Sequence, residues 1–316
     1  MSLNNLLLRL TYGLLSLFIL SVIIFVCTHL LPGDAAVAIL GENATPEALQ
    51  SIRDRLGLER PMLIQYGSWI AGVVRGDLGV STTLNQPVGD LIAPAFGTSM
   101  AIAAVTLLIA AAIAIPLGVL AALRRGRRTD AAILSVSYVG ISIPEFVIGP
   151  LLIMLLASPP LLLFPSSGHV PFATDPVGWL SHAALPVTAL TIVLVAHLMR
   201  QTRSGMIDVL ASDYIRTARL KGLPERLVIR RHALRNALTA TITVLALDVG
   251  YLMGSIVVVE EIFAYPGLGR LVIYAVANRD LPLVLGTTLI IGAIYVLANF
   301  AADLVHGFLN PRVGHA

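Results

Sequence analysis

Three carboxylates interrupt long apolar stretches of this 316-residue chain: Glu145, Asp248 and Asp303. A charged side chain is costly in hydrocarbon, so each of them is first a candidate functional residue. We expect Asp303, near the end of its stretch, to be interfacial or ion-paired. For Glu145, a structural alternative is that it binds backbone groups freed by the preceding Pro144. We interpret His197, near the end of another stretch, as a hydrogen-bonded structural residue rather than a metal or proton site.

The sequence lacks the common catalytic motifs. Its only lysine, Lys221, is followed by Gly222 and preceded by Leu220, so there is no Gly-Lys-Ser/Thr loop to bind ATP phosphates. None of the seven histidines precedes a glutamate, and no Gly-x-Ser-x-Gly nucleophile turn occurs. We therefore predict that the chain is not an enzyme and holds no metal or cofactor of its own.

Composition places these residues in a membrane. With 57% hydrophobic residues, 12% charged residues and a mean hydropathy of +0.86, the chain is too apolar for a water-soluble domain. A helix needs about 20 apolar residues to cross the hydrocarbon core. The stretches are continuous rather than alternating, which favours helices over barrel strands. We predict an all-α bundle in one membrane domain, 1–316, with six spans: 10–31, 98–123, 131–157, 180–199, 237–259 and 283–305.

The first span carries the single cysteine, Cys27, so no disulfide within the chain is possible. Its apolar stretch exceeds the usual length of a signal peptide, and no small-x-small cleavage site follows. We interpret it as a retained anchor.

Lysine and arginine indicate the orientation. Six spans put both termini on one side, and 15 of the 21 Lys and Arg residues then lie on that side. The positive-inside rule makes this side cytoplasmic. The net charge of +3 thus reflects topology and does not indicate nucleic-acid binding.

The longest predicted external connection is the segment 32–97. It contains an expected helix from Thr45 to Leu56, with Thr45 as its N-cap and Gly57 after its end. A second stretch, Pro61 to Val74, is amphipathic and predicts a face made of Leu63, Tyr66, Trp69 and Ile70.

The predicted cytoplasmic loop 204–236, called the basic loop here, contains helix start and stop signals. Ser212 or Asp213 can cap a short helix from Tyr214 to Lys221. Gly222 suits the left-handed position after that helix, and Pro224 opens a second helix at its first turn. We predict a compact helix, turn and helix that forms a docking surface for a soluble partner.

Spacing divides the side chains of this short helix. Arg216 and Arg219 share one face, whereas Tyr214, Ile215 and Ala218 are available for packing. The arginines that border spans have a simpler explanation, because the positive-inside rule alone accounts for Arg200, Arg203 and Arg235.

Gly250 and Gly254 form a Gly-x-x-x-Gly ridge in the fifth span, where another helix could approach closely. We prefer packing within the bundle to packing against another protein.

The basic loop resembles a known family. The run Asp213-Tyr-Ile-Arg-Thr-Ala-Arg-Leu-Lys-Gly-Leu-Pro-Glu-Arg, continued by Arg231-His-Ala-Leu-Arg-Asn, is similar to the EAA loop of ABC importer permeases, most of all in the dipeptide, oligopeptide and nickel branch. Arg216 and Thr217 stand where the general motif has Glu and Ala. Further stretches resemble family motifs in family order, and they include Leu31-Pro-Gly-Asp, Gly76-Asp-Leu-Gly, Ser142-Ile-Pro-Glu-Phe, Glu260-Glu-Ile-Phe-Ala-Tyr-Pro-Gly-Leu-Gly-Arg and Leu309-Asn-Pro-Arg.

The resemblance implies a transport subunit of a bacterial inner membrane. Its partners would be a second homologous permease, two cytoplasmic ATPases that bind ATP and Mg, and an external solute-binding protein. The helix in the basic loop would be the coupling helix, and its implied contact residues are Tyr214, Arg216, Thr217, Ala218, Arg219, Lys221, Gly222, Leu223 and Pro224.

The resemblance also gives the intramembrane carboxylates a role. It places the segment of Pro144 and Glu145 beside the translocation path, and we expect Asp248 there too. Glu260 and Glu261 would face either the outer gate or the binding protein.

We expect the imported solute to be a di- or oligopeptide, with nickel or a metal chelate as the alternative. A competing class is an ion-driven secondary transporter, whose signs would be paired intramembrane charges and internal repeats. Glu145 and Asp248 are compatible with that class, but no repeat is evident.

Overall fold

The computed structural model describes residues 3–30, 45–47, 50 and 60–309. Helices dominate these residues, and within them no strand forms; β pairing is limited to an isolated bridge between Val80 and Pro87. The all-α prediction is confirmed. The expected helix from Thr45 to Leu56 lies largely outside the described residues.

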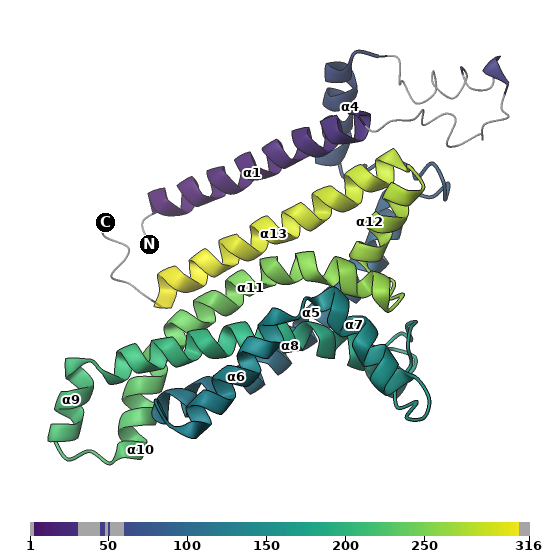
Figure 1. The fold of residues 1–316 in the computed structure, drawn as a ribbon. Helices are drawn as coiled ribbons and strands as arrows, with labels where there is room; N and C mark the ends of the chain where they lie inside the picture. Colours follow the sequence, from purple (N-terminus) through teal and green to yellow (C-terminus); the bar gives the residue numbers. More distant parts are fainter. Residues whose placement is uncertain (1–2, 31–44, 48–49, 51–59, 310–316) are drawn as a thin grey trace. The chain divides into compact units, whose positions relative to one another are not determined.

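The longer helices are α1 (Leu3–Leu30), α5 (Val88–Leu123), α8 (Pro176–Leu210), α11 (Leu234–Ile262) and α13 (Leu281–Leu309) (Figure 1). Among the described residues, five helical segments are long and apolar enough to cross a membrane: Leu7–Leu30, Val88–Leu123, Pro176–Leu210, Glu225–Ile262 and Leu281–Val305. Five of the six predicted spans fall on these segments, with ends that differ by several residues.

The remaining expected span, 131–157, which is the third along the chain, contains a sharp bend. Its two halves, α6 (Arg128–Ser142) and α7 (Glu145–Leu152) continued by the π-helical turn Ile153–Ala157, are bent by 97°. The cause is Pro144, because proline disfavours helical backbone at the residue before it. Ile143 accordingly has φ −101° and ψ 115°. The predicted span thus falls on a bent helix pair, which is either a broken span or a re-entrant loop.

The shorter helices are α4 (Met62–Val74), α9 (Asp213–Leu220), α10 (Glu225–Leu227), the π-helical turn Val228–Ala233 and α12 (Leu268–Ala277). The predicted amphipathic helix is therefore present as α4. Its Tyr66 and Trp69 rings pack against Phe25 of α1, with centroids 5.3 and 5.8 Å from it. Leu63, which we placed on the same face, is 85% exposed.

The contacts of the chain divide it into two compact units, although the sequence predicted one domain. Unit 1 comprises 1–10, 100–265 and 297–316, and unit 2 comprises 11–99 and 266–296. The ion pair between Arg9 and Asp303 lies within unit 1 and agrees with the role expected for Asp303.

Unit 2 contains an internal clasp formed by Asp280, which precedes α13. Three groups donate hydrogen bonds to its Oδ2: the Ser81 hydroxyl (2.5 Å), the Thr83 hydroxyl (2.7 Å) and the Thr83 backbone N–H (3.1 Å). Its Oδ1 accepts from the Leu283 N–H, so the same carboxylate caps α13. We call these contacts the Asp280 clasp.

Burial raises the pKa of Asp280, which is fully enclosed, but the hydrogen bonds from Ser81 and Thr83 outweigh this effect. The net pKa lies below the ordinary value of an aspartate. The clasp is therefore built for the charged carboxylate.

Candidate functional site

The basic loop is mostly helical in the structure. Helix α8 continues to Leu210, α9 occupies Asp213–Leu220, and helix resumes at Glu225 and runs without a break into α11 (Figure 1). The segment 204–236 is therefore more helical than we expected, since α8 extends into its start and α11 into its end. What remains between the helices is two short connections, 211–212 and 221–224.

The expected helix, turn and helix is present within this segment. Gly222 has φ +75°, the left-handed conformation that glycine adopts without a Cβ clash. Its N–H donates to the carbonyl of Arg219 (2.9 Å), and the Leu223 N–H donates to the carbonyl of Ala218 (3.4 Å). These two bonds form a Schellman motif, which ends α9 and reverses the chain.

Two details at the helix starts differ from the expectation. The Ser212 hydroxyl donates back to the carbonyl of Val209 (2.5 Å), and neither it nor Asp213 caps α9 with a side chain. Pro224 occupies the N-cap of α10 rather than its first helical position. Both helices still begin next to the predicted residues.

One face of α9 is fixed by apolar packing. Ile215 is fully buried and Ala218 is 8% exposed. They belong to a cluster with residues from the ends of four other elements: Ala122 of α5, Met206 of α8, Val228 and Ala233 of the π-helical turn, and Ala237 of α11. We call this set the α9 cluster. It attaches α9 to three of the long helices.

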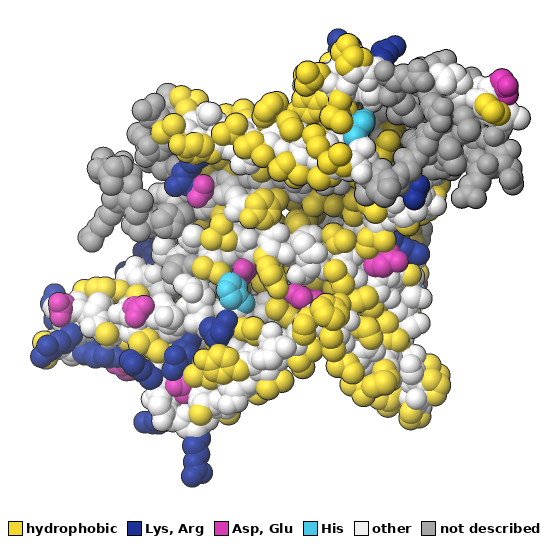
Figure 2. All heavy atoms as spheres, turned by 45° about the horizontal axis from the view of Figure 1, so that its top comes forward, with side chains coloured by type: hydrophobic (Ala, Val, Ile, Leu, Met, Phe, Trp, Pro, Cys, Tyr) yellow, Lys and Arg dark blue, Asp and Glu magenta, His cyan; other side chains and the backbone are white. Residues whose placement is uncertain are grey.

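The other face of α9 is exposed and basic. Of the nine predicted contact residues, Ala218 is buried and Leu223 is half-buried, because both take part in the packing. The remaining seven, Tyr214, Arg216, Thr217, Arg219, Lys221, Gly222 and Pro224, are exposed. Figure 2 shows Lys and Arg side chains gathered at the end of the molecule formed by α9 and α10. This surface suits an acidic or polar groove of a soluble protein.

Two polar contacts join α9 to the helices that follow it, and we call this part of the chain the α9 corner. Arg219 binds the carboxylate of Glu225 across the turn, with Nη2 to Oε1 at 2.7 Å, and this bond raises the pKa of the Arg219 guanidinium. The Asn236 amide donates to the Tyr214 hydroxyl (2.8 Å). Both contacts are exposed, so each adds little to stability.

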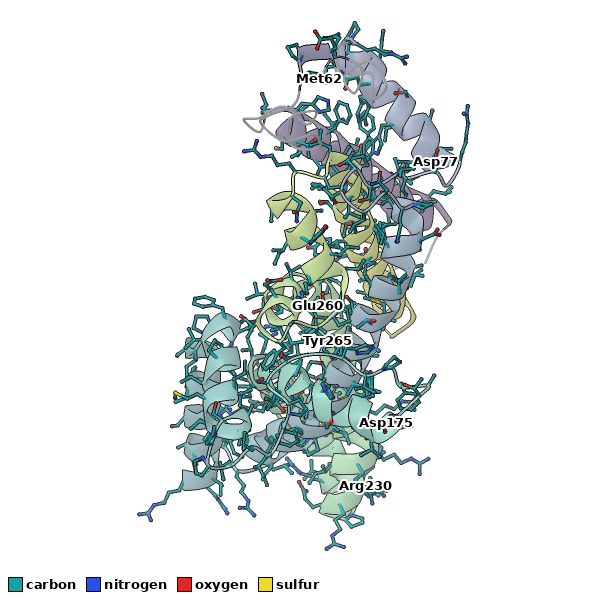
Figure 3. All side chains as sticks on the ribbon, turned by 90° about the vertical axis from the view of Figure 1, so that its right-hand side faces the viewer. Met62, Asp77, Asp175, Arg230, Glu260 and Tyr265 are labelled. Atoms are coloured by element: carbon teal, nitrogen blue, oxygen red, sulfur yellow. The ribbon has the colours of Figure 1, made fainter. Side chains whose placement is uncertain are left out.

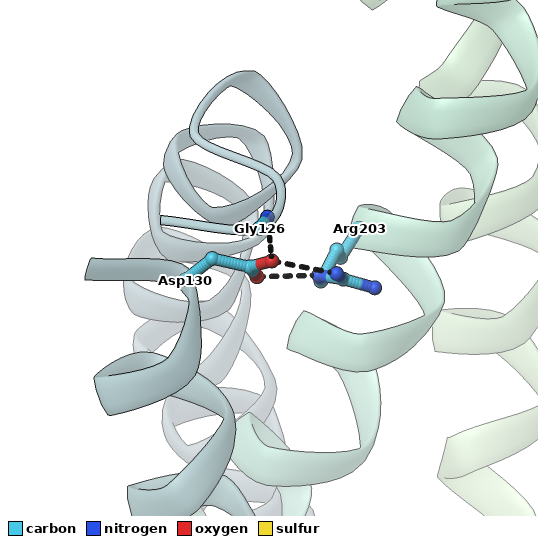
Figure 4. Close-up of polar contacts among 3 residues, drawn as sticks. All are labelled: Gly126, Asp130 and Arg203. Atoms are coloured by element: carbon cyan, nitrogen blue, oxygen red, sulfur yellow. Dashed lines mark hydrogen bonds and ion pairs between the residues drawn. The ribbon is translucent and has the colours of Figure 1, made fainter. Parts of the chain in front are cut away.

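A buried ion pair lies within the same unit and was missed from the sequence. Both nitrogens of the Arg203 fork, Nε and Nη2, donate to the Asp130 carboxylate at 2.7 and 2.8 Å (Figure 4). The Gly126 N–H donates to the same carboxylate (2.9 Å). Asp130 is 4% exposed, so this pair ties the turn between α5 and α6 to α8, close to α9 along the chain. For Arg203 the topology explanation is therefore incomplete.

The second group of predicted residues lies along α11. Asp248, Tyr251 and Ser255 have spacings of three and four residues and share one helix face. The Tyr251 hydroxyl and the Ser255 hydroxyl both donate to Oε1 of Glu145, at 2.8 and 3.0 Å. We call Asp248, Tyr251 and Ser255 of α11, together with Glu145 of α7, the α11 polar face. Glu145 is held by side-chain hydroxyls rather than by backbone groups freed by Pro144.

Asp248 contacts His197 of α8, with Oδ1 and Nδ1 3.2 Å apart. The Asp248 side chain is 6% exposed and that of His197 is 52% exposed. Oδ2 of Asp248 is buried without a hydrogen-bond partner among the described residues. The structure therefore brings together two residues, His197 and Asp248, that we considered separately.

The predicted pair Glu260 and Glu261 divides between interior and surface. Glu260 is 1% exposed and Glu261 is exposed. Glu260 and Tyr265 lie together at the end of α11 (Figure 3), where the carbonyl of Glu260 accepts from the Tyr265 N–H (2.8 Å). Burial, and then the nearby Glu260 charge, raise the pKa of Tyr265 to about 12. Of the two, Glu261 alone offers an exposed carboxylate to a path or a partner.

The glycine ridge of α11 has an open end. Gly250 is buried, but Gly254 is exposed, and no heavy atom of the described residues lies within 4 Å of the position that a Cβ would take there. The packing within the bundle that we preferred is not present at Gly254.

Within the described residues, no group of three or more His, Cys, Asp or Glu side chains is arranged to hold a metal ion. The two notable features of unit 1 are the exposed basic face of α9 and the polar side chains where α7 meets α11.

Comparison with known proteins assigns this architecture to a family. Residues 114–315 match the family described as binding-protein-dependent transport system inner membrane component, and residues 2–118 match the N-terminal region of the same kind of component. A peptide transport system permease protein of Brucella abortus is 40% identical over 297 residues, which cover 94% of each chain. The dipeptide transport system permease protein DppB of Escherichia coli is 37% identical over 94% of each chain. A peptide ABC transporter permease protein of Sinorhizobium fredii is 34% identical over 96% of this chain and 97% of its own.

Proposed function

Because the chain belongs to the family of inner-membrane components of binding-protein-dependent transport systems, we propose that it is the permease subunit of an ATP-driven importer of di- and oligopeptides. It forms half of the translocation pathway and works with other components of an ABC transporter. The relatives named for peptide or dipeptide transport support peptide as the solute.

The observation that carries the proposal is the construction of α9. A short helix with a basic outer face is held by the α9 cluster to the ends of α5, α8 and α11. A force applied to the exposed face passes to three spans through packed side chains, which have little room to yield. The helix acts as the coupling helix, seated in a groove of an ATPase subunit.

The remaining parts of the assembly follow from this role. A second homologous permease completes the pathway, two ATPases bind ATP and Mg on the cytoplasmic side, and a solute-binding protein delivers peptide from outside. Both termini are cytoplasmic, on the side where the positive-inside rule places 15 of the 21 cationic residues. ATP-driven closure of the ATPases shifts the spans between inward-open and outward-open arrangements.

The α11 polar face belongs to the translocation path in this scheme. Its carboxylates and hydroxyls lie within a span, and polar groups there are retained where they meet a polar solute or water. Gly254, which has an open surface, contributes to the contact with the second permease.

The experiment is uptake into vesicles reconstituted with this chain, the homologous permease and the two ATPases encoded beside it, and their binding protein. Radiolabelled dialanine should accumulate only when ATP is present on the side of the membrane that carries the ATPases. Omission of the ATPases or of the binding protein should abolish uptake. ATP-independent uptake driven by an ion gradient would contradict the proposal, and uptake of Ni²⁺ without peptide would contradict the choice of solute.

A further inference from the structure

Glu145, the first residue of α7, has no cationic partner among the described residues of unit 1. Both of its hydrogen bonds come from hydroxyls, those of Tyr251 and Ser255, and both go to Oε1. Within the described residues of unit 1 its Oε2 has no hydrogen bond and no Lys, Arg or His lies within ion-pair distance. A half-buried carboxylate that is oriented by two hydroxyls can accept a further hydrogen bond from a cationic group.

Asp248 gives an independent indication at the same face. Its side chain is more than nine-tenths buried, and Oδ2 has no partner in the part of the chain that the structure describes. A buried carboxylate oxygen without a donor is costly, and a transient ligand with N–H donors would satisfy it. Two carboxylate oxygens, Oε2 of Glu145 on α7 and Oδ2 of Asp248 on α11, thus have no donor among the described residues.

The cationic side chains described near this face, His197 and Arg200, do not neutralise Glu145. His197 contacts Oδ1 of Asp248 and leaves Oδ2 free. Arg200, one turn further along α8, lies 5.7 Å from the centre of the Tyr138 ring in a cation–π contact. Neither group makes an ion pair with Glu145.

The dimensions of the polar face fit a short peptide. Asp248 and Ser255 are seven residues apart, which is about 10 Å along a helix. An extended tripeptide has about the same length. The Glu145 end of the face is accessible, because Tyr251 is 54% exposed, whereas Asp248 lies deeper and is 4% exposed.

We propose that the α11 polar face binds the protonated amino group of the passing peptide, with Glu145 as the main acceptor and Asp248 as the second. An ammonium group carries three N–H donors, which matches free carboxylate oxygens better than it matches any neutral part of a peptide backbone. This inference rests on the proposed function and names the part of the peptide that the path recognises.

The test is Glu145→Gln in vesicles with the complete transporter and saturating peptide-loaded binding protein. At pH 7 the maximal rate of dialanine uptake should fall about tenfold, because a charge-assisted hydrogen bond is replaced by a neutral one. Glu145→Asp, which keeps the charge, should recover part of the rate. Asp90→Asn, the same kind of change at an exposed position of α5, should transport like the wild type.

A second readout separates recognition of the ammonium group from a structural role. The amino group of a peptide has a pKa of about 8, so it is mostly neutral at pH 9. The wild-type rate, corrected for peptide bound to the binding protein, should fall between pH 7 and pH 9, whereas the Glu145→Gln rate should stay nearly level. His197, Arg200, Asp248 and Tyr251 are present in both proteins, so their contribution cancels in this comparison.

The outcomes distinguish the two proposals. If the wild type takes up dialanine and Glu145→Gln does so at the same rate, or with the same fall at pH 9, the inference is wrong and the proposed function stands. Assembled Glu145→Asp that is as slow as Glu145→Gln would show that charge is not what matters. A wild-type complex that takes up no peptide at all contradicts the proposed function itself.

Discussion

The corner around α9 and the Asp280 clasp both hold a turn against helices, but they use different interactions. At α9, a Schellman motif reverses the chain and an apolar cluster from five elements buries Ile215 and Ala218. In the clasp, one carboxylate receives three hydrogen bonds from Ser81 and Thr83. Apolar packing is distributed over many atoms and does not depend on pH, whereas the clasp depends on one ionised group. The difference agrees with the coupling role that we propose for α9.

The largest effect is expected at Gly222. A Gly222→Trp substitution should reduce ATP-dependent uptake about 100-fold or more, because it places a bulky side chain at the centre of the docking surface and strains a left-handed residue. No heavy atom of the described residues lies within 4 Å of the position that a Cβ would take at Gly222, so the protein should still insert and fold. Uptake in reconstituted vesicles measures the effect, and membrane fractionation checks insertion.

Gly126 provides a matched control. It also has a left-handed φ, +76°, and open space where a Cβ would lie. Gly126→Trp carries the same backbone strain at a different turn and should keep most of the uptake. Equal losses in both variants would attribute the effect to strain and would sink the docking role of Gly222.

The next largest effect is expected at Asp280. Asp280→Ala should lower the free energy of unfolding by about 3 kcal/mol, because the donors of buried Ser81 and half-buried Thr83 lose their acceptor. Asp280→Asn keeps one acceptor oxygen and should recover part of the loss. Unfolding in detergent, followed by circular dichroism, measures both. A loss in Asp280→Ala no larger than in exposed Asp90→Ala would show that the clasp does not stabilise unit 2.

The clasp should also respond to acid. Since the pKa of Asp280 is lower in the folded protein than in the unfolded chain, its stabilising contribution is complete above about pH 4 and is lost as the pH falls through the folded pKa. The difference in unfolding temperature between the wild type and Asp280→Asn should therefore be constant from pH 7 to 5 and shrink below pH 4. A difference that grows on acidification would contradict the assigned charge state.

The smallest effect is expected at the exposed pair of Arg219 and Glu225, whose side chains are 43% and 54% exposed. Glu225→Gln should change the free energy of unfolding by less than about 1 kcal/mol, because solvent screens the pair. Comparison with Arg219→Gln and the double variant measures the coupling between the two residues. A coupling above 2 kcal/mol would mean that the α9 corner depends on charge, like the clasp, and would remove the contrast between them.

The α9 corner could be predicted from sequence because its signals are local. The glycine after the helix, Pro224 and the spacing of Ile215 and Ala218 all fall within about a dozen residues. Such signals fix the end of a helix and its buried face without knowledge of the rest of the fold. The helical class and the approximate spans were equally accessible from continuous apolar stretches.

The long-range polar contacts could not be predicted in the same way. Asp130 and Arg203 are 73 residues apart, and Glu145 and Tyr251 are 106 apart. Nothing in either local segment identifies the partner. The 97° bend at Ile143 did have a local signal. Pro144 disfavours helical backbone at the residue before it, although the apolar stretch continues past it.

The continuity of α8 has a mechanical consequence. Its 35 residues form one helix from the N-cap at Asp175 to the residues that join the α9 cluster. Such a helix is roughly 52 Å long, so it acts as a lever arm. A tilt of about 5° at the α9 end would displace the far end by roughly 4 to 5 Å, comparable to the width of a peptide backbone. In the proposed function, a small rotation where α9 docks would thereby become a movement large enough to open or close the translocation path.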